Sequence, residues 1–335
     1  MPNQENTLQA FTQSQFELAK LYLATHVTTM MGRKLEEGDW SSVYCKAKGI
    51  PDGGWSNLNI DVNHKGLGLE LKVLRISQLN GRALKNVCGT TLMHPSATRS
   101  IRIDDVDQDA NVVMNSVLQQ YAELIELRTQ KVRQLAEGAQ PDMRTGWLIW
   151  EDNLTEFLYF EERMVAPVAS NYFAAWNETG ARGARKPSRS LWIYDKETEQ
   201  KRYSITTSAG IKIQPYFDVP APTDPNLCYF RVQGEKINAD TILLWVSFAT
   251  AEALKAKLGS LDKTTVSKAI AKIIQMGVEP GVAMDGAGDY AQSIPVDASV
   301  YQQLVGAWEA CSDEHRGQLL LKALNASLDV PKTVV

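Results

Sequence analysis

The sequence is poor in cysteine and has no long apolar run. Its four cysteines, Cys45, Cys88, Cys228 and Cys311, are scattered without a Cys-x-x-Cys pair. This spacing predicts neither a disulfide framework nor a standard zinc site. No segment approaches the roughly 18 apolar residues of a membrane helix, and the polar N-terminus lacks the apolar segment of a signal peptide. We therefore expect a soluble, cytoplasmic protein without a membrane partner.

Several common catalytic motifs are also missing. The sequence contains no His-Glu-x-x-His pair, no Gly-x-Ser-x-Gly elbow and no Gly-x4-Gly-Lys phosphate loop, so the chemistries that depend on them are not indicated. The net charge is −4, which gives no global positive field for a nucleic-acid partner. Local charge patches decide that question rather than the total.

The composition is that of an ordinary globular protein. The 335 residues are 44% apolar and 22% charged, which is enough chain for one large or two modest domains. Patterning predicts a mixed α/β body over residues 1–260 and a small helical C-terminal part over 261–335. The expected helices are 13–37, 104–137, 165–178 and 251–258, and the expected strands are 146–150, 156–162, 190–195, 201–207, 227–233 and 241–248.

The most informative segment is a predicted hairpin over residues 58–76. Two β-rich runs, LNIDV and LGLELKVLRI, flank the polar turn Asn63-His64-Lys65-Gly66. Because side chains alternate along a strand, Glu70 and Lys72 share one face while the intervening leucines enter the core. The hairpin brings Asp61 back towards them. The pattern therefore predicts a cluster of two carboxylates and one lysine.

Such a cluster has a defined chemical use. Mg²⁺ prefers a few carboxylates, water and substrate phosphate, and it can polarise a phosphoryl oxygen and activate water. A nearby lysine can orient or deprotonate the attacking water, or neutralise developing charge. The alternative is a chance match on a solvated strand face, since Glu199-Gln200-Lys201 repeats the Glu-x-Lys pattern. That second copy lies in a polar run without an apolar strand or a preceding acid.

With these residues the chain resembles the PD-(D/E)XK nuclease superfamily, which includes many restriction endonucleases. Asp61 in IDV matches the first acidic position, and Glu70 and Lys72 in LELKV match the (D/E)XK element. The order of helix, hairpin, long helix and further strands over residues 13–160 is also similar. Ile60 replaces the proline of the pattern, and Pro51-Asp52 is a literal but less suitable alternative.

The resemblance implies a restriction-endonuclease-like mixed central sheet flanked by helices, and Mg²⁺-dependent hydrolysis of DNA phosphodiesters. Asp61 and Glu70 would hold the metal, the Leu71 carbonyl would complete its coordination, and Lys72 would assist the water. An acid from the first helix, Glu37 or Glu17, is a further ligand candidate. Many such enzymes are homodimers, since two sites related by a two-fold axis cut antiparallel strands.

Two arginine-containing segments are candidates for contact with double-stranded DNA. Residues 180–212 carry eight basic and three acidic side chains, a local balance of +5 in a chain of net −4. Arginine can pair with phosphate or with guanine. A second segment, HPSATRSIRI over residues 94–103, follows the hairpin and sets small hydroxyl side chains beside Arg99 and Arg102. A solvated surface loop is the alternative for the first segment. The candidate contacts are Arg99, Arg102, Arg182, Arg185, Lys186 and Arg189.

The sequence therefore predicts a type II-like, site-specific DNA endonuclease of the hydrolase class. Two alternatives stay open. One is a non-catalytic DNA-binding or modification-sensing protein of the same fold, against which the intact acid-acid-lysine set argues. The other is an unrelated α/β protein in which the hairpin motif is coincidental.

Overall fold

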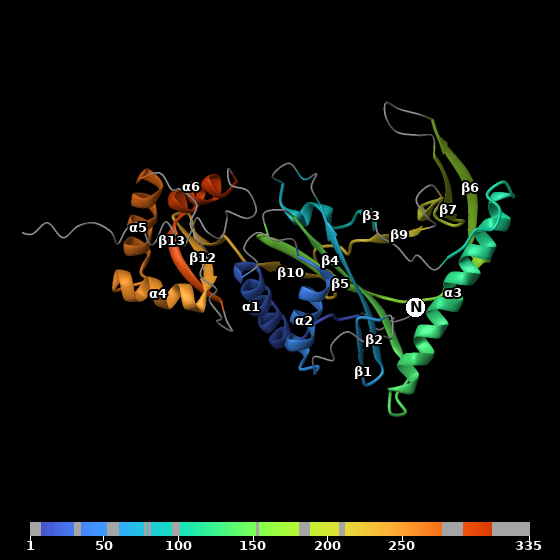
Figure 1. Cartoon of the computed structure of the whole chain (residues 1–335), viewed down its shortest axis with the longest axis horizontal. Coiled ribbons are helices and arrows are strands. Elements are labelled where there is room, and N and C mark those ends of the chain that lie inside the picture. Colours follow the sequence, from blue (N-terminus) through green and yellow to red (C-terminus); the bar gives the residue numbers. More distant parts are fainter. Residues whose placement is uncertain are drawn as a thin grey trace, which may run out of the picture.

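The computed structural model describes residues 8–29, 35–51, 60–76, 79, 82–95, 101–151, 154–180, 188–207, 212–276 and 291–309. These residues form a mixed α/β protein with three sheets (Figure 1). In the view of Figure 1 the central sheet lies between a C-terminal unit and a second sheet covered by one long helix. No helix among the described residues is long and apolar enough to cross a membrane.

The central sheet has the strand order β1-β2-β4-β5-β10. Strands β2 and β4 are parallel, and the remaining pairs are antiparallel. The predicted hairpin is confirmed: β1 pairs with β2 around Lys65 and Gly66, whose φ angles of 46° and 87° form the tight turn. The strands are β1 (Val62–His64), β2 (Leu67–Arg75), β4 (Asp142–Trp150), β5 (Glu156–Arg163) and β10 (Cys228–Arg231).

One face of this sheet is covered by two helices, α1 (Gln13–Thr29) and α2 (Glu37–Lys48). Their core side chains include Trp40 and Tyr44, which pack with Leu69 and Leu71 of β2 and with Tyr159 of β5. As predicted from strand alternation, the leucines are fully buried while Glu70 and Lys72 face the other way. The apolar half of β2 therefore fixes the side on which the polar residues lie.

The opposite face of the central sheet contacts the second sheet, which has the order β3-β9-β8-β7-β6. Phe217 of β9 stacks on Trp147 of β4 with ring centroids 3.9 Å apart. Helix α3 (Ala110–Gln134) packs on the second sheet through Val113, Val117 and their neighbours. The strands are β3 (Thr91–Met93), β6 (Tyr172–Thr179), β7 (Ser188–Asp195), β8 (Lys201–Thr206) and β9 (Lys212–Asp218); short 3-10 turns lie at Leu84–Val87 and Ala169–Asn171.

The C-terminal unit has a sheet of its own. Strands β11 (Glu235–Asn238), β12 (Thr241–Ser247) and β13 (Ala291–Asp297) are antiparallel. They share a core with α4 (Phe248–Leu258), α5 (Lys263–Met276) and α6 (Ala298–Glu309). Residues 261–335, predicted as a small helical part, contribute strand β13 to this sheet as well as helices α5 and α6. The predicted boundary at residue 260 lies between α4 and α5, inside this unit.

Three predicted helices differ from the structure. The helix predicted over 13–37 ends at Thr29, soon after its apolar period stops at Val27, and α2 starts separately at Glu37. The helix predicted over 104–137 starts only at Ala110, because the Asp109 carboxylate caps it by accepting from the Asn111 and Val112 amides.

The third difference is the helix predicted over 165–178, which is mainly strand β6. Ala174 is buried, and Tyr172 and Trp176 pack beside it against the core under α3. This alternation has the period of a strand. Pairing with β7 over the whole of β6 then outweighs the modest helical preference of its alanines.

Candidate active site

The hairpin brings the two predicted carboxylates together beside the middle of β2. Asp61 directly precedes β1, and the register of Val62 with Leu69 places it opposite Glu70. The Leu71 amide donates to Asp61 Oδ2 over 2.6 Å. This backbone bond fixes the Asp61 carboxyl group beside β2. The acid on the first strand and the Glu-x-Lys element on the second thus belong to one cluster.

Lys72 lies among the oxygen atoms of that cluster. Its Nζ is 2.9 Å from Glu70 Oε1, 3.0 Å from the Leu71 carbonyl oxygen and 3.4 Å from Glu37 Oε1. Three of the four predicted metal-ligating groups therefore surround one cation. The fourth, Asp61, is held next to them through the Leu71 amide.

Of the two candidate helical acids, Glu37 contacts the cluster. It is the first residue of α2, and the Asp39 carboxylate helps to fix this start by accepting from the Glu36 amide over 2.9 Å. Glu17, on α1, instead accepts a hydrogen bond from Gln13 over 2.8 Å. Glu37 therefore belongs to a second helix, which the sequence pattern did not separate from the first. Asp52, the alternative to Asp61, lies outside the described residues.

Helix α3 adds two residues that sequence reasoning missed. Arg128 Nη2 lies 3.6 Å from Glu70 Oε1, and Tyr121, seven residues earlier, faces the same region. A spacing of seven residues places two side chains on the same face of a helix. The sequence therefore indicated that Tyr121 and Arg128 share one face of the helix. Only the packing of α3 shows that this face meets Glu70 of β2.

Burial and charge set the protonation of the cluster. Asp61 as a residue is exposed, but its carboxyl group is turned against the protein. Burial, with the charge of Glu70 second, raises its pKa to about 6 against the opposing effects of the Leu71 amide and Lys72. Burial disfavours the Lys72 ammonium, yet the charges of Glu70 and Glu37 outweigh it, so the pKa of Lys72 is raised. Lys72 is therefore a cation at neutral pH.

The oxygen atoms around Lys72 are of the type that Mg²⁺ takes. Mg²⁺ sites commonly use one or two carboxylates, with water and substrate phosphate supplying the rest. Asp61, Glu70 and the Leu71 carbonyl meet that requirement. Within the described ranges, no group of three or more His, Cys, Asp or Glu side chains is arranged to hold a metal ion. Any ion here would accordingly depend on backbone, water and substrate oxygen as well.

Glu70 and Lys72 of the cluster line a cleft between the central sheet, the second sheet and α3. Strand register puts Glu70 beside Thr145 of β4, and Thr145 beside Glu162 of β5, in one row across the sheet. All three line the cleft, together with Lys72 and Arg128. Glu162 was another residue that the sequence did not single out. Its signal was a charge on the inner face of an apolar strand, EFLYFEE.

The predicted DNA contacts are placed only in part. Arg99, Arg182, Arg185 and Lys186 lie outside the described residues. Arg102 is exposed, and its backbone is bonded to the Gln120 side chain. Arg189 is engaged within the protein, because its guanidinium lies 4.4 Å from the Trp176 ring centroid and 2.8 Å from Asp107. To contact DNA as predicted, the Arg189 guanidinium would have to leave both Trp176 and Asp107.

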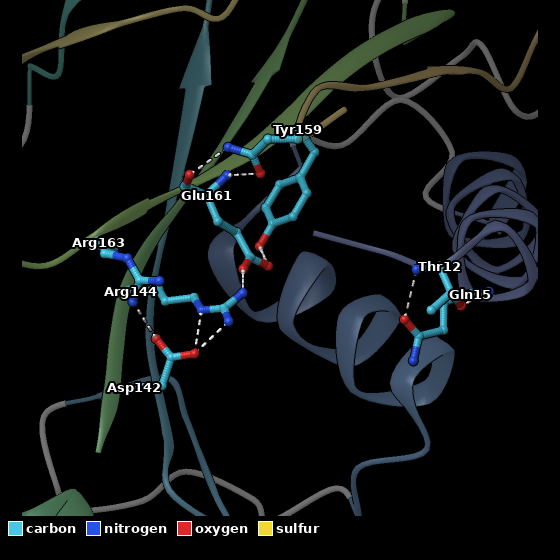
Figure 2. A network of polar contacts seen from close by, with 8 residues as sticks. Thr12, Gln15, Asp142, Arg144, Tyr159, Glu161 and Arg163 are labelled. Carbon is cyan, nitrogen blue, oxygen red and sulfur yellow. Dashed lines mark hydrogen bonds and ion pairs between the residues drawn. The ribbon is translucent and has the colours of Figure 1, made fainter. Parts of the chain in front are cut away.

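A buried charge network lies behind the site, on the sheet face that α1 and α2 cover (Figure 2). Arg144 Nη1 donates to Glu161 Oε2 over 2.7 Å, and the same guanidinium is bound to Asp142. Tyr159 Oη donates to Glu161 Oε1 over 3.0 Å. Arg144 and Glu161 each neighbour a cleft residue in sequence, Thr145 and Glu162. The network therefore helps to hold β4 and β5 in the register that builds the row of polar residues.

No family model, curated protein or solved structure matches this chain. The family resemblance consequently rests on the hairpin residues and their geometry alone.

Replacing Asp61 with asparagine is expected to stabilise the metal-free protein at high pH. The unfolded carboxyl group loses its proton near pH 3.8 and the folded one near pH 6, so wild-type stability falls as the pH rises through this window. Asparagine avoids that loss and can still accept the Leu71 hydrogen bond. Because Asp61 is partly solvated, we expect a gain of only about 1 kcal/mol, or about 2–4 °C in Tm at pH 8.

The measurement is thermal unfolding in EDTA at pH 4 and pH 8, with Asp104→Asn, an exposed acid before α3, as the control. A lower Tm for Asp61→Asn at pH 8 would show that the carboxylate stabilises the fold and that the pKa argument is wrong.

Proposed function

We propose that this protein is a Mg²⁺-dependent DNA endonuclease that hydrolyses phosphodiester bonds, of the type II site-specific restriction class. The observation that carries the proposal is the convergence of Asp61, Glu70 and Lys72 at the end of one hairpin, with Lys72 Nζ 2.9 Å from Glu70. The Glu-x-Lys copy at Glu199 lacks this setting, since Glu199 and Gln200 lie in the exposed turn before β8 and Lys201 lies over the Trp192 ring.

In this proposal Asp61, Glu70 and the Leu71 carbonyl hold the metal, with Glu37 as a further ligand candidate. Bound Mg²⁺ would supply Lewis-acid stabilisation of a phosphoryl oxygen. The protein's own contribution is electrostatic and positional. Lys72, kept protonated by Glu70 and Glu37, places a positive charge where negative charge develops on the phosphate. Arg128 lies 3.6 Å from the same Glu70 oxygen and adds a second cation.

The arrangement favours a cationic role for Lys72 over that of a general base. A base must be unprotonated before it can accept a proton from water, and the two neighbouring carboxylates oppose that state. Glu70 also orients the ammonium, because it pairs with Lys72 and Arg128 simultaneously. Removal of Glu70 would therefore affect both the metal site and the placement of the lysine.

The test is incubation of the protein with mixed-sequence plasmid DNA in Mg²⁺, with EDTA as the metal-free arm. We expect discrete fragments in Mg²⁺ and intact plasmid in EDTA, since without the metal no Lewis acid polarises the phosphoryl oxygen or activates the attacking water. Tight DNA binding without fragments would favour the non-catalytic alternative. Neither binding nor cleavage, across several sequences and methylation states, would overturn the nuclease proposal. A homodimer remains a prediction, which sedimentation of the protein on duplex DNA would check.

A further inference from the structure

The cleft beside the cluster carries aromatic side chains on several walls. Strand β4, helix α3 and the second sheet all contribute rings to its lining. Some of these rings are fixed by edge contacts: Tyr203 lies 6.1 Å from Tyr121 and 5.8 Å from Tyr172, with interplanar angles of 72° and 69°. The aromatic lining residues are Tyr121, Trp147, Tyr172, Tyr203, Tyr216 and Phe217.

The lining of the same cleft has more basic than acidic side chains. Lys72, Arg128, Arg163 and Arg202 line it with two acids, Glu70 and Glu162, while Arg163 and Arg202 also pair with Asp142 and Asp218 beside it. Aromatic platforms interleaved with basic side chains are typical of sites that bind unpaired nucleotides, because bases stack on the rings while the cations meet phosphates. An apolar small-molecule pocket would not need four cations.

Glu162 gives this cleft a group that can recognise a base. Its carboxyl group is inside the cleft and accepts a hydrogen bond from Trp147 Nε1 over 2.7 Å. Glu162 lies two strands away from Glu70 along the row through Thr145, about 10 Å at the usual strand spacing. One nucleotide can bridge a separation of this size between its phosphate and the edge of its base.

We propose that the cleft holds a single unpaired nucleotide of the DNA substrate, with the base against the aromatic wall and its amino-bearing edge at Glu162. This proposal rests on the proposed function, since it places the phosphate of that nucleotide towards Glu70 and Lys72. A carboxylate accepts from the exocyclic amino group of cytosine, and the same donor occurs on adenine. Thymine has no such donor and presents a carbonyl oxygen in its place.

The protonation of Glu162 supports the same pairing. Burial raises the pKa of Glu162 to about 7, against the opposing effect of the Trp147 hydrogen bond. Near neutral pH a fraction of the carboxyl group is therefore protonated, and it can donate to a ring nitrogen while accepting from the amino group. Cytosine and adenine present that donor–acceptor pair on the edge used for base pairing. A base in a duplex has this edge occupied, which is why the nucleotide must be unpaired.

The test measures binding of fluorescein-labelled single-stranded 12-mers of dC, dA and dT to the full chain in EDTA, by fluorescence anisotropy. We expect dC and dA to bind about tenfold more tightly than dT, as one good base contact allows. Glu162→Ala should reduce the affinities for dC and dA to that for dT and leave dT unchanged. Tyr216→Ala should weaken all three by about tenfold through lost stacking. Glu199→Gln, in the exposed β7–β8 turn, should change none of them.

Base-independent binding that neither Glu162→Ala nor Tyr216→Ala alters would overturn the nucleotide site. If Glu162→Ala fails to fold, Glu162→Gln replaces it in the test. The amide keeps the volume of the side chain, and we expect it to reduce the preference for dC over dT. The assay contains no metal, so it is independent of cleavage. Base-selective binding without cleavage in Mg²⁺ would support the nucleotide site and contradict the nuclease proposal. Cleavage with unselective binding would support the nuclease proposal and contradict the nucleotide site.

Discussion

Replacing Lys72 with methionine is expected to lower the rate of DNA cleavage by about 10²–10³-fold, the usual loss on removing one preorganised charge from a transition state. Methionine keeps most of the aliphatic length of lysine but cannot place an ammonium among Glu70, Glu37 and the Leu71 carbonyl. Glu70→Gln should be at least as damaging, because Glu70 is both a proposed metal ligand and the partner of Lys72 and Arg128. The measurement is the single-turnover cleavage rate in Mg²⁺.

Two matched controls separate this effect from a general change of surface charge. Lys236→Met removes an exposed lysine from β11, and Glu199→Gln alters the second Glu-x-Lys copy. Both should cleave at the wild-type rate and unfold at the wild-type temperature. If Lys72→Met cleaves as fast as Lys236→Met, the hairpin cluster is not the active site. The unrelated-fold alternative would then be the better interpretation.

Arg144→Met should have the largest effect on stability. The Glu161 side chain is fully buried, at 0% exposure, and Arg144 is its charged partner at 2.7 Å. Without the guanidinium the buried carboxylate keeps the hydrogen bond from Tyr159 and the charge of Lys48, but loses the cation that is hydrogen-bonded to it. Breaking a buried pair by removing one partner costs about 3–5 kcal/mol, which corresponds to a fall of about 10 °C in Tm. Urea unfolding followed by tryptophan fluorescence would measure the loss.

Arg163→Met is the matched control for that experiment. Arg163 contacts the same Asp142 at 3.7 Å (Figure 2), but its side chain is 53% exposed. Its replacement should cost less than about 1 kcal/mol. The double variant Arg144→Met/Glu161→Gln should recover part of the stability, because no buried charge is then left unpaired. Equal losses for Arg144→Met and Arg163→Met would contradict this account of the network.

Short-range patterns in the sequence predicted the hairpin and its polarity. Strand alternation alone places Glu70 and Lys72 on one face and Leu69 and Leu71 on the other, and the Lys65-Gly66 turn brings Asp61 back to them. These features depend only on neighbours within about ten residues. The same reasoning failed for β6, whose alanines favour a helix locally but whose pairing with β7 and packing under α3 require a strand.

The amino-acid sequence by itself determined the acid-acid-lysine cluster, since one hairpin contains all three residues. Only the tertiary structure decided what surrounds it. Glu37 comes from α2, Arg128 from α3 and Glu162 from β5, and no local pattern states which elements meet. The cleft exists because the second sheet packs on the central one through Phe217 and Trp147. Such contacts depend on which face of one sheet or helix packs against which face of another. The pattern of residues along a single segment does not specify that pairing.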